Sequence, residues 1–361
     1  MTGLDASGTA HGWSDSGRSG ALGAAAAPTD VGLAGQQLQQ VLGELQRVIV
    51  GQDRVLERVL VALLAGGHCL LEGVPGLGKT LTVSTLARTL GGTFTRLQFT
   101  PDLLPSDIVG TRVYRPSSER FDVELGPVFA NFVLADEINR APAKVQSALL
   151  EVMAERQVSL GGVTHPLPSP FLVLATQNPI ESEGVYPLPE AQRDRFLMRI
   201  PVGYPTFREE HEIVDRARRP TVEPATLLST DDVLRLQATA AAVDVDPAVQ
   251  DYAVRLVLAS REPAAAGVEI DGLLAYGASP RASIGLVVAA RALALIRGRD
   301  HVLPQDVYDV AYDVLNHRLV LSFDAVADGV TVDDVLVTLL TTVTAPRLSS
   351  SELHSRAAAR R

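Results

Sequence analysis

The chain has 361 residues, of which 46% are hydrophobic and 20% are charged, and its formal net charge is −10 at pH 7. This length suggests two folded domains, and the hydrophobic fraction is ordinary for a globular protein with a sizeable core. The acidic balance argues against a general nucleic-acid-binding protein, which normally carries a basic face. Because Cys69 is the only cysteine, a disulfide within the chain is excluded.

Membrane insertion and secretion are not expected from the sequence. No apolar run reaches the roughly 20 residues that a membrane helix requires, and the longest candidate, 284–296, contains Arg291. The N-terminus does not combine a basic stretch with an apolar segment, so it does not resemble a secretory signal. We therefore expect a cytoplasmic protein without a membrane span.

Composition and periodicity divide the chain into four parts. Residues 1–33 are rich in Gly, Ala, Ser and Thr and lack apolar periodicity, which predicts disorder. Residues 34–205 alternate helical patterns with apolar strands, and this alternation predicts an α/β core around a parallel sheet. The strands are expected at 68–72, 93–99, 132–135 and 171–176.

Two strand pairs interrupt this scheme and predict hairpin insertions, one formed by 111–114 with 121–124 and one by 157–160 with 163–166. The second pair flanks Gly161-Gly162, a good hairpin signal. Strand patterns are absent after residue 205, and the helical patterns of 206–346 predict an all-helical second domain. Residues 347–361 are expected to form a flexible basic tail.

The strongest motif is a glycine-rich loop between a predicted strand and a predicted helix. Its residues are Gly73, Val74, Pro75, Gly76, Leu77, Gly78, Lys79 and Thr80, and they fit the pattern G-x-x-x-x-G-K-[ST]. In such a loop the backbone N–H groups surround a phosphate chain, and the positive end of the following helix strengthens binding. We expect Lys79 to contact the β and γ phosphates of ATP and the Thr80 hydroxyl to ligate Mg²⁺.

Polar side chains follow two further apolar strands. Asp136 and Glu137 end the strand at 132–135, and Asn178 follows the strand at 171–176. Because nucleotides bind at the carboxyl edge of parallel strands, Asp136 is a candidate Mg²⁺ ligand and Glu137 a candidate base for the attacking water. Asn178 can hydrogen-bond that water or the γ-phosphate. Its simpler interpretation is an Asn-Pro turn signal.

Together with further motifs, these residues resemble the MoxR-type AAA+ ATPases. The resemblance covers residues 35 to 345 and is carried by 50–52, 73–80, 98–107, 125–130, 134–142, 175–179, 186–191, 194–196 and 277–281. It implies an AAA+ P-loop NTPase with a parallel-sheet αβα core, hairpin insertions and a C-terminal all-helical lid.

The resemblance also implies a homo-oligomeric ring, usually a hexamer, with ATP between subunits. Arg195 matches the arginine finger, which reaches into the neighbouring subunit's site. Arg193 stands nearby where the family commonly has an apolar residue, so either arginine could be the finger. Arg281 matches the second sensor, which is expected to touch the phosphates of its own subunit. Val50 and Gly51 match the turn that contacts adenine.

Three functions are compatible with these residues. The resemblance favours an ATP-driven remodelling or maturation factor that acts on protein clients, often with a partner that carries a von Willebrand factor A domain. A nucleic-acid motor is disfavoured by the acidic charge and by the lack of interleaved basic and aromatic residues. The motor subunit of a metal chelatase, which would assist metal insertion into a porphyrin, remains the closest alternative.

Overall fold

The computed structural model describes residues 29–117, 119–179, 184–220 and 222–347. Disorder was predicted for residues 1–33, and 1–28 of these lie outside the described residues. The first helix already begins at Val31. The predicted flexible tail, 347–361, lies outside them from residue 348 onwards.

A five-stranded parallel sheet forms the centre of the N-terminal part. Its order is β2-β5-β8-β1-β9, and the strands are β1 (Cys69–Glu72), β2 (Phe94–Gln98), β5 (Phe132–Asp136), β8 (Leu172–Gln177) and β9 (Met198–Pro201). Neighbouring strands pair in register along their length. All carboxyl ends therefore meet at one edge of the sheet.

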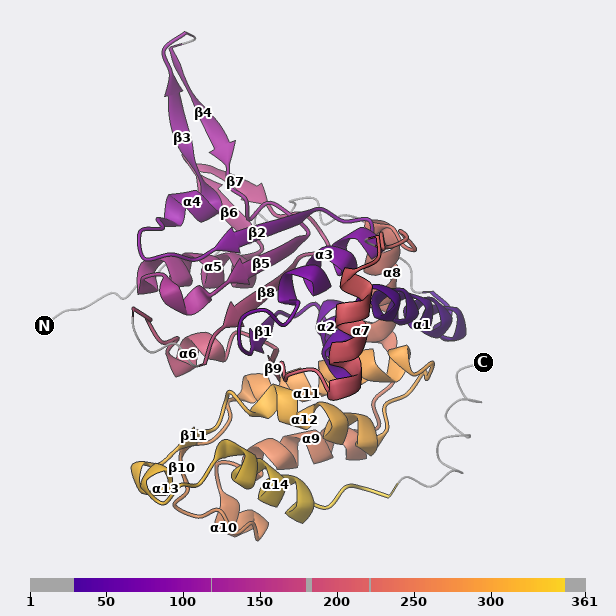
Figure 1. Ribbon diagram of the computed structural model, residues 1–361. Helices are drawn as coiled ribbons and strands as arrows, with labels where there is room; N and C mark the ends of the chain where they lie inside the picture. Colours follow the sequence, from indigo (N-terminus) through magenta and orange to yellow (C-terminus); the bar gives the residue numbers. More distant parts are fainter. Residues whose placement is uncertain (1–28, 118, 180–183, 221, 348–361) are drawn as a thin grey trace, which may run out of the picture.

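Helices cover both faces of this sheet. Successive residues of a strand point to opposite faces, so in β5 Leu134 packs into one apolar cluster and Val133 and Ala135 into another. This two-sided burial confirms the predicted αβα core (Figure 1). Its helices are α1 (Val31–Val48), α2 (Asp53–Leu64), α3 (Lys79–Thr89), α4 (Pro105–Val109), η1 (Ile138–Arg140), α5 (Ala143–Glu155) and α6 (Glu190–Arg193).

Two hairpins interrupt the core at the predicted places, formed by β3 (Gly110–Arg115) with β4 (Arg120–Leu125) and by β6 (Gln157–Leu160) with β7 (Val163–Pro166). The β3–β4 hairpin projects away from the body of the molecule (Figure 1). Its base requires glycine, because a Cβ at Gly110 would lie 2.2 Å from the carbonyl oxygen of Glu124.

The C-terminal part is a helical lid joined to the core by α7 (Phe207–Ala217). Its central helix, α11 (Pro280–Ile296), packs against α1 and α2, so a single apolar cluster runs from the sheet into the lid. The lid helices are α8 (Thr230–Ala242), α9 (Pro247–Ala259), α10 (Pro263–Ala266), α11 (Pro280–Ile296), α12 (Pro304–Leu315), α13 (Phe323–Ala327) and α14 (Val332–Thr342).

The lid differs from its sequence prediction in one respect. It contains a short antiparallel pair, β10 (Leu274–Tyr276) with β11 (Val320–Leu321). Segments of three and two residues are too short to show a twofold alternation in the sequence, and so they were not predicted. Among the residues described, no helix has the length and apolar character needed to cross a membrane.

Buried His68 makes stability depend on pH. Its Nδ1 accepts from the Val173 N–H at 3.0 Å, so the neutral ring carries its proton on Nε2, which lies 3.3 Å from the Met153 carbonyl oxygen. Burial lowers the pKa of His68 from 6.5 to about 4. Because the unfolded chain binds the proton more tightly, the contribution of His68 to stability is complete above pH 6.5 and is lost as the pH falls towards 4.

We therefore expect the free energy of unfolding to fall by about 2 kcal/mol between pH 7 and pH 5 through His68 alone. Urea unfolding at the two pH values measures this fall. The His68→Gln variant, which has no group that titrates in this range, should show a correspondingly smaller difference. An equal difference in both proteins would exclude His68 as the cause.

Candidate functional site

The carboxyl edge of the sheet brings most of the predicted site residues together. The loop after β1, the end of β5 and the end of β8 surround a cavity of about 220 Å³. Its lining residues are Gly73, Pro75, Gly76, Leu77, Gly78, Lys79, Thr80, Arg96, Asp136, Glu137, Thr176 and Asn178. Val50, Gly51 and Val74, which were also predicted to bind nucleotide, are not among them.

The glycine-rich loop has the backbone conformation that its sequence requires. Gly76 and Gly78 have φ angles of 85° and 73°, which side chains other than glycine rarely adopt. A Cβ at either glycine would meet no heavy atom within 4 Å. Glycine is needed here for the backbone conformation, and the space beside the loop is open to a ligand.

Lys79 begins helix α3 and extends its ammonium back into the loop, where it donates to the Gly73 carbonyl oxygen. Burial lowers the pKa of Lys79, and the carboxylates of Asp136 and Glu137 oppose this shift. Lys79 and Arg96 therefore line the cavity together with the carboxylates of Asp136 and Glu137, beside the positive end of a helix. The Lys79 ammonium and the helix start suit phosphate oxygens, whereas the carboxylates suit a cation that binds with the phosphates.

Thr176, near the end of β8, joins this strand to the end of β5, where the two acids stand. Its hydroxyl donates to Asp136 Oδ1 at 2.6 Å and accepts from the Glu137 N–H at 2.8 Å. The other oxygen of Asp136 accepts from Arg96 Nη2 at 2.6 Å. Sequence analysis assigned no role to Thr176 or Arg96. The only signal for Arg96 was a charged residue within a predicted strand that is otherwise uncharged.

Glu137 has an unusual backbone conformation, with φ 56° and ψ 51°. A non-glycine residue in this left-handed region is uncommon and often marks a functional position. Its carboxylate accepts from Gln98 Nε2 at 2.8 Å and lies 3.2 Å from Arg140 Nε. Asn178, which is buried, lines the same cavity.

The turn at Val50-Gly51 is connected to the glycine-rich loop through its next residue. Gln52 Nε2 donates to the Leu77 carbonyl oxygen at 3.0 Å. Gly51 has φ 67°, and a Cβ there would lie 2.4 Å from an oxygen of Glu209. The turn is thus held between the loop and α7, and its predicted adenine contact stays a prediction.

Arg195 and Arg281, the predicted finger and the predicted second sensor, lie at a second, separate cavity of about 520 Å³. Its lining residues are His68, Ser147, Leu150, Glu151, Met153, Ala154, Glu155, Gln192, Arg195 and Arg281. Arg195 Nη1 donates to the Leu150 carbonyl oxygen at 2.9 Å. Arg193 does not line this cavity and pairs with Glu190 at 3.4 Å.

The position of Arg281 differs from its prediction. It was expected to touch the phosphates of its own subunit, yet it lines the second cavity with Arg195 and pairs with Asp194 at 3.2 Å. The reason is the start of α11, which Ser279 fixes beside Asp194 through hydrogen bonds of 2.9 and 3.1 Å. Both arginines therefore belong to a surface distinct from the P-loop cavity.

Comparisons with known proteins agree with this architecture. A family model described as "ATPase family associated with various cellular activities (AAA)" matches residues 68–198, and an AAA lid domain model matches 269–339. A crystal structure of a candidate ATPase from Cytophaga hutchinsonii is similar, with a TM-score of 0.83 and 47% identity over 88% of this chain and 97% of that one.

Among curated proteins, Chaperone MoxR1 of Mycobacterium tuberculosis is 60% identical over 314 residues, which are 87% of this chain and 83% of that protein. Protein MoxR of Methylorubrum extorquens is 36% identical over 77% of this chain and 86% of its own length. A magnesium-chelatase subunit, ChlI-2 of Arabidopsis thaliana, is more distant, at 28% identity over 64% and 52%. The chain belongs to the MoxR-type AAA+ ATPases.

Proposed function

We propose that this protein binds ATP in the P-loop cavity and hydrolyses it to ADP and phosphate. The observation that carries the proposal is the convergence of Lys79, Asp136 and Glu137 on one open cavity beside the start of a helix. Glycine N–H groups and Lys79 would hold the phosphates. Glu137 would take a proton from the attacking water, and Asn178 would orient that water.

The cavity also offers suitable donors for Mg²⁺. The Thr80 hydroxyl and the Asp136 carboxylate are oxygen ligands of the kind that Mg²⁺ prefers. Thr176 and Arg96 occupy hydrogen-bonding positions on Asp136 and so fix its orientation. When bound, Mg²⁺ would neutralise charge on the phosphates.

The separation of the two cavities supports a ring of identical subunits, and we propose a hexamer. Arg195 and Arg281 share one cavity, and neither lines the P-loop cavity of their own subunit. Facing a neighbouring subunit, both guanidinium groups would contact its ATP, because their planar donors suit phosphate oxygens. Sedimentation with and without nucleotide measures the number of subunits.

Coupling of hydrolysis to the remodelling of protein clients is the proposed biological role, in keeping with the name of the relative Chaperone MoxR1. The projecting β3–β4 hairpin carries an exposed aromatic pair, Tyr114 and Phe121, with ring centroids 5.2 Å apart. Such exposed apolar groups suit contact with proteins. A von Willebrand factor A domain protein is one partner to test.

The proposed phosphate contact of Lys79 gives a direct prediction. Lys79→Ala removes the cation that faces two carboxylates, so affinity for ATP should fall about 10- to 100-fold, as expected for the loss of a hydrogen bond to a charged group. Fluorescent-nucleotide titration measures the effect. Lys144→Ala, a change of a lysine that does not line the cavity, is the matched control and should bind normally. Equal affinity in both variants would contradict the proposal.

Clients can be captured with a variant that binds ATP but hydrolyses it slowly. Glu137→Gln with ATP and Mg²⁺ should retain partner proteins that the same variant releases without nucleotide, and mass spectrometry identifies them. DNA fragments in the same binding assay test the nucleic-acid motor. Stimulation of metal insertion into a porphyrin would favour the chelatase alternative.

A further inference from the structure

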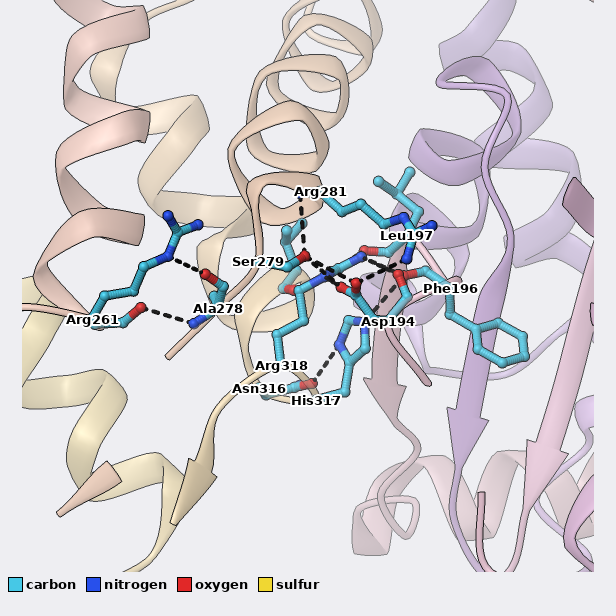
Figure 2. A network of polar contacts seen from close by, with 12 residues as sticks. Asp194, Phe196, Leu197, Arg261, Ala278, Ser279, Arg281, Asn316, His317 and Arg318 are labelled. Atoms are coloured by element: carbon cyan, nitrogen blue, oxygen red, sulfur yellow. Dashed lines mark hydrogen bonds and ion pairs between the residues drawn. The ribbon is translucent and has the colours of Figure 1, made fainter. Parts of the chain in front are cut away.

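Asp194, the residue before Arg195, is the centre of a polar network that joins the core to the lid (Figure 2). Its carboxylate receives hydrogen bonds from three lid residues, Ser279, Arg281 and Arg318. These come from the start of α11 and from the segment between α12 and β11. The network thus lies directly beside the proposed finger.

Arg318 makes the largest set of contacts in this network. Its Nε donates to Asp194 Oδ1 at 2.8 Å, and its terminal nitrogens donate to the carbonyl oxygens of Asp194 at 3.2 Å, Phe196 at 2.6 Å and Leu197 at 3.1 Å. The backbone is therefore held on both sides of Arg195. Neighbouring His317 adds a contact of 3.1 Å from its Nε2 to the Phe196 carbonyl oxygen.

The two arginines on the Asp194 carboxylate differ in their freedom to move. The side chain of Arg318 is 3% exposed, whereas that of Arg281 is 61% exposed and makes one contact of 3.2 Å with Asp194. Releasing Arg318 would strand a buried charge and several carbonyl groups, which is costly. Releasing Arg281 into solvent or onto a phosphate costs little.

We propose that Arg318 and Asp194 are positioning residues for the arginine finger. Arg318 fixes the backbone that presents Arg195, and Asp194 holds Arg281 beside Arg195 until a neighbouring subunit's nucleotide draws it away. The lid and the finger of one subunit then act as a rigid unit on the next subunit's ATP. This inference rests on the proposed function, since it requires Arg195 to work across a subunit interface.

A second buried ion pair between the same two parts of the molecule provides a matched control. Asp313 on α12 accepts from Arg58 on α2 at 2.9 Å and from Arg54 at 2.7 Å. This contact also joins the lid to the N-terminal helices, and none of its residues lines either of the two cavities described above. The kcat of Asp313→Asn therefore measures how turnover responds when an ion pair between the lid and the N-terminal helices is weakened away from both cavities.

The experiment compares Asp194→Asn, Arg318→Lys and Asp313→Asn in steady-state ATPase assays. The first two variants keep a hydrogen-bonding group but lose the carboxylate charge or the multiple contacts of the guanidinium. We expect their kcat to fall about 10- to 100-fold, as for a catalytic group displaced by roughly 1 Å. Their affinity for ADP and the kcat of Asp313→Asn should stay within about twofold of the wild type.

Mixing variants separates positioning from general damage to the fold. Glu137→Gln subunits hydrolyse ATP very slowly but present an intact finger. In excess, they should restore turnover by Asp194→Asn subunits, because the P-loop cavity of those subunits is unchanged. Turnover by Arg318→Lys subunits should be restored in the same way. Because this variant keeps the buried positive charge, it provides the test if Asp194→Asn folds poorly.

Each outcome separates the inference from the proposed function. Normal turnover of Asp194→Asn and Arg318→Lys, with Arg195→Ala inactive, would overturn the positioning role and leave the proposed function standing. Low turnover that mixing does not restore would also overturn it, because the defect would then lie in the subunit's own site. Normal turnover of Arg195→Ala would instead remove the role of Arg195 across the subunit interface, on which the inference rests, and would leave ATP hydrolysis in the P-loop cavity standing.

Discussion

Replacement of Glu137 by Gln is expected to leave ATP binding intact and to slow hydrolysis about 10²- to 10⁴-fold, the usual contribution of a general base. The carboxamide keeps the shape of the side chain and its ability to accept from Gln98, which lies 2.8 Å away. It cannot take a proton from water. Single-turnover phosphate release measures the rate, and fluorescent-nucleotide titration measures the affinity.

A neutral substitution elsewhere provides the control for this variant. Glu190 is an exposed acid that pairs with Arg193 on the short helix α6, and Glu190→Gln should hydrolyse ATP at the wild-type rate. If Glu137→Gln turned over as fast as Glu190→Gln, Glu137 could not be the base. Another acid at the cavity would then have to accept the proton.

Replacement of Arg195 by Ala is expected to reduce turnover about 10³- to 10⁵-fold, the range observed when an arginine finger is supplied or withheld. Arg195 lies at a cavity separate from the P-loop, so the affinity of the variant for ADP should not change. The loss would arise because no guanidinium from the neighbouring subunit neutralises charge on the transferring phosphoryl group. Steady-state kinetics with a parallel binding titration tests both parts.

Arg193 allows the finger assignment to be tested within the same segment of chain. Its side chain pairs with Glu190 and does not line the cavity of Arg195, so Arg193→Ala should retain turnover. Mixing Arg195→Ala with Glu137→Gln subunits should recover activity, since one supplies the intact site and the other the intact finger. Loss of turnover in Arg193→Ala alone would reverse the assignment.

The sequence predicted the parts of the site that are local in the chain. Gly76, Gly78 and Lys79 form the loop because each requirement, a positive φ or a charge at the start of a helix, acts within a few residues. The acids at the end of β5 were also predictable, because an apolar run that ends in carboxylates fixes their place at the sheet edge.

Contacts between distant segments could not be predicted in the same way. Arg281 was predicted to touch the phosphates of its own subunit, and the structure places it at the second cavity instead. Its position depends on how α11 starts against Asp194, 87 residues away in the chain. Arg318 was missed because its partners are backbone carbonyl groups of the core, which leave no pattern in the sequence. Thr176 bridges two acids only because β8 pairs beside β5.

The account depends on a nucleotide site in the P-loop cavity, and calorimetric titration of the folded protein with ADP and Mg²⁺ tests that site most directly. The account predicts saturable binding of one nucleotide per chain, greatly weakened in Lys79→Ala. Absence of heat and of any competition with a fluorescent nucleotide, in a sample shown to be folded, would contradict it.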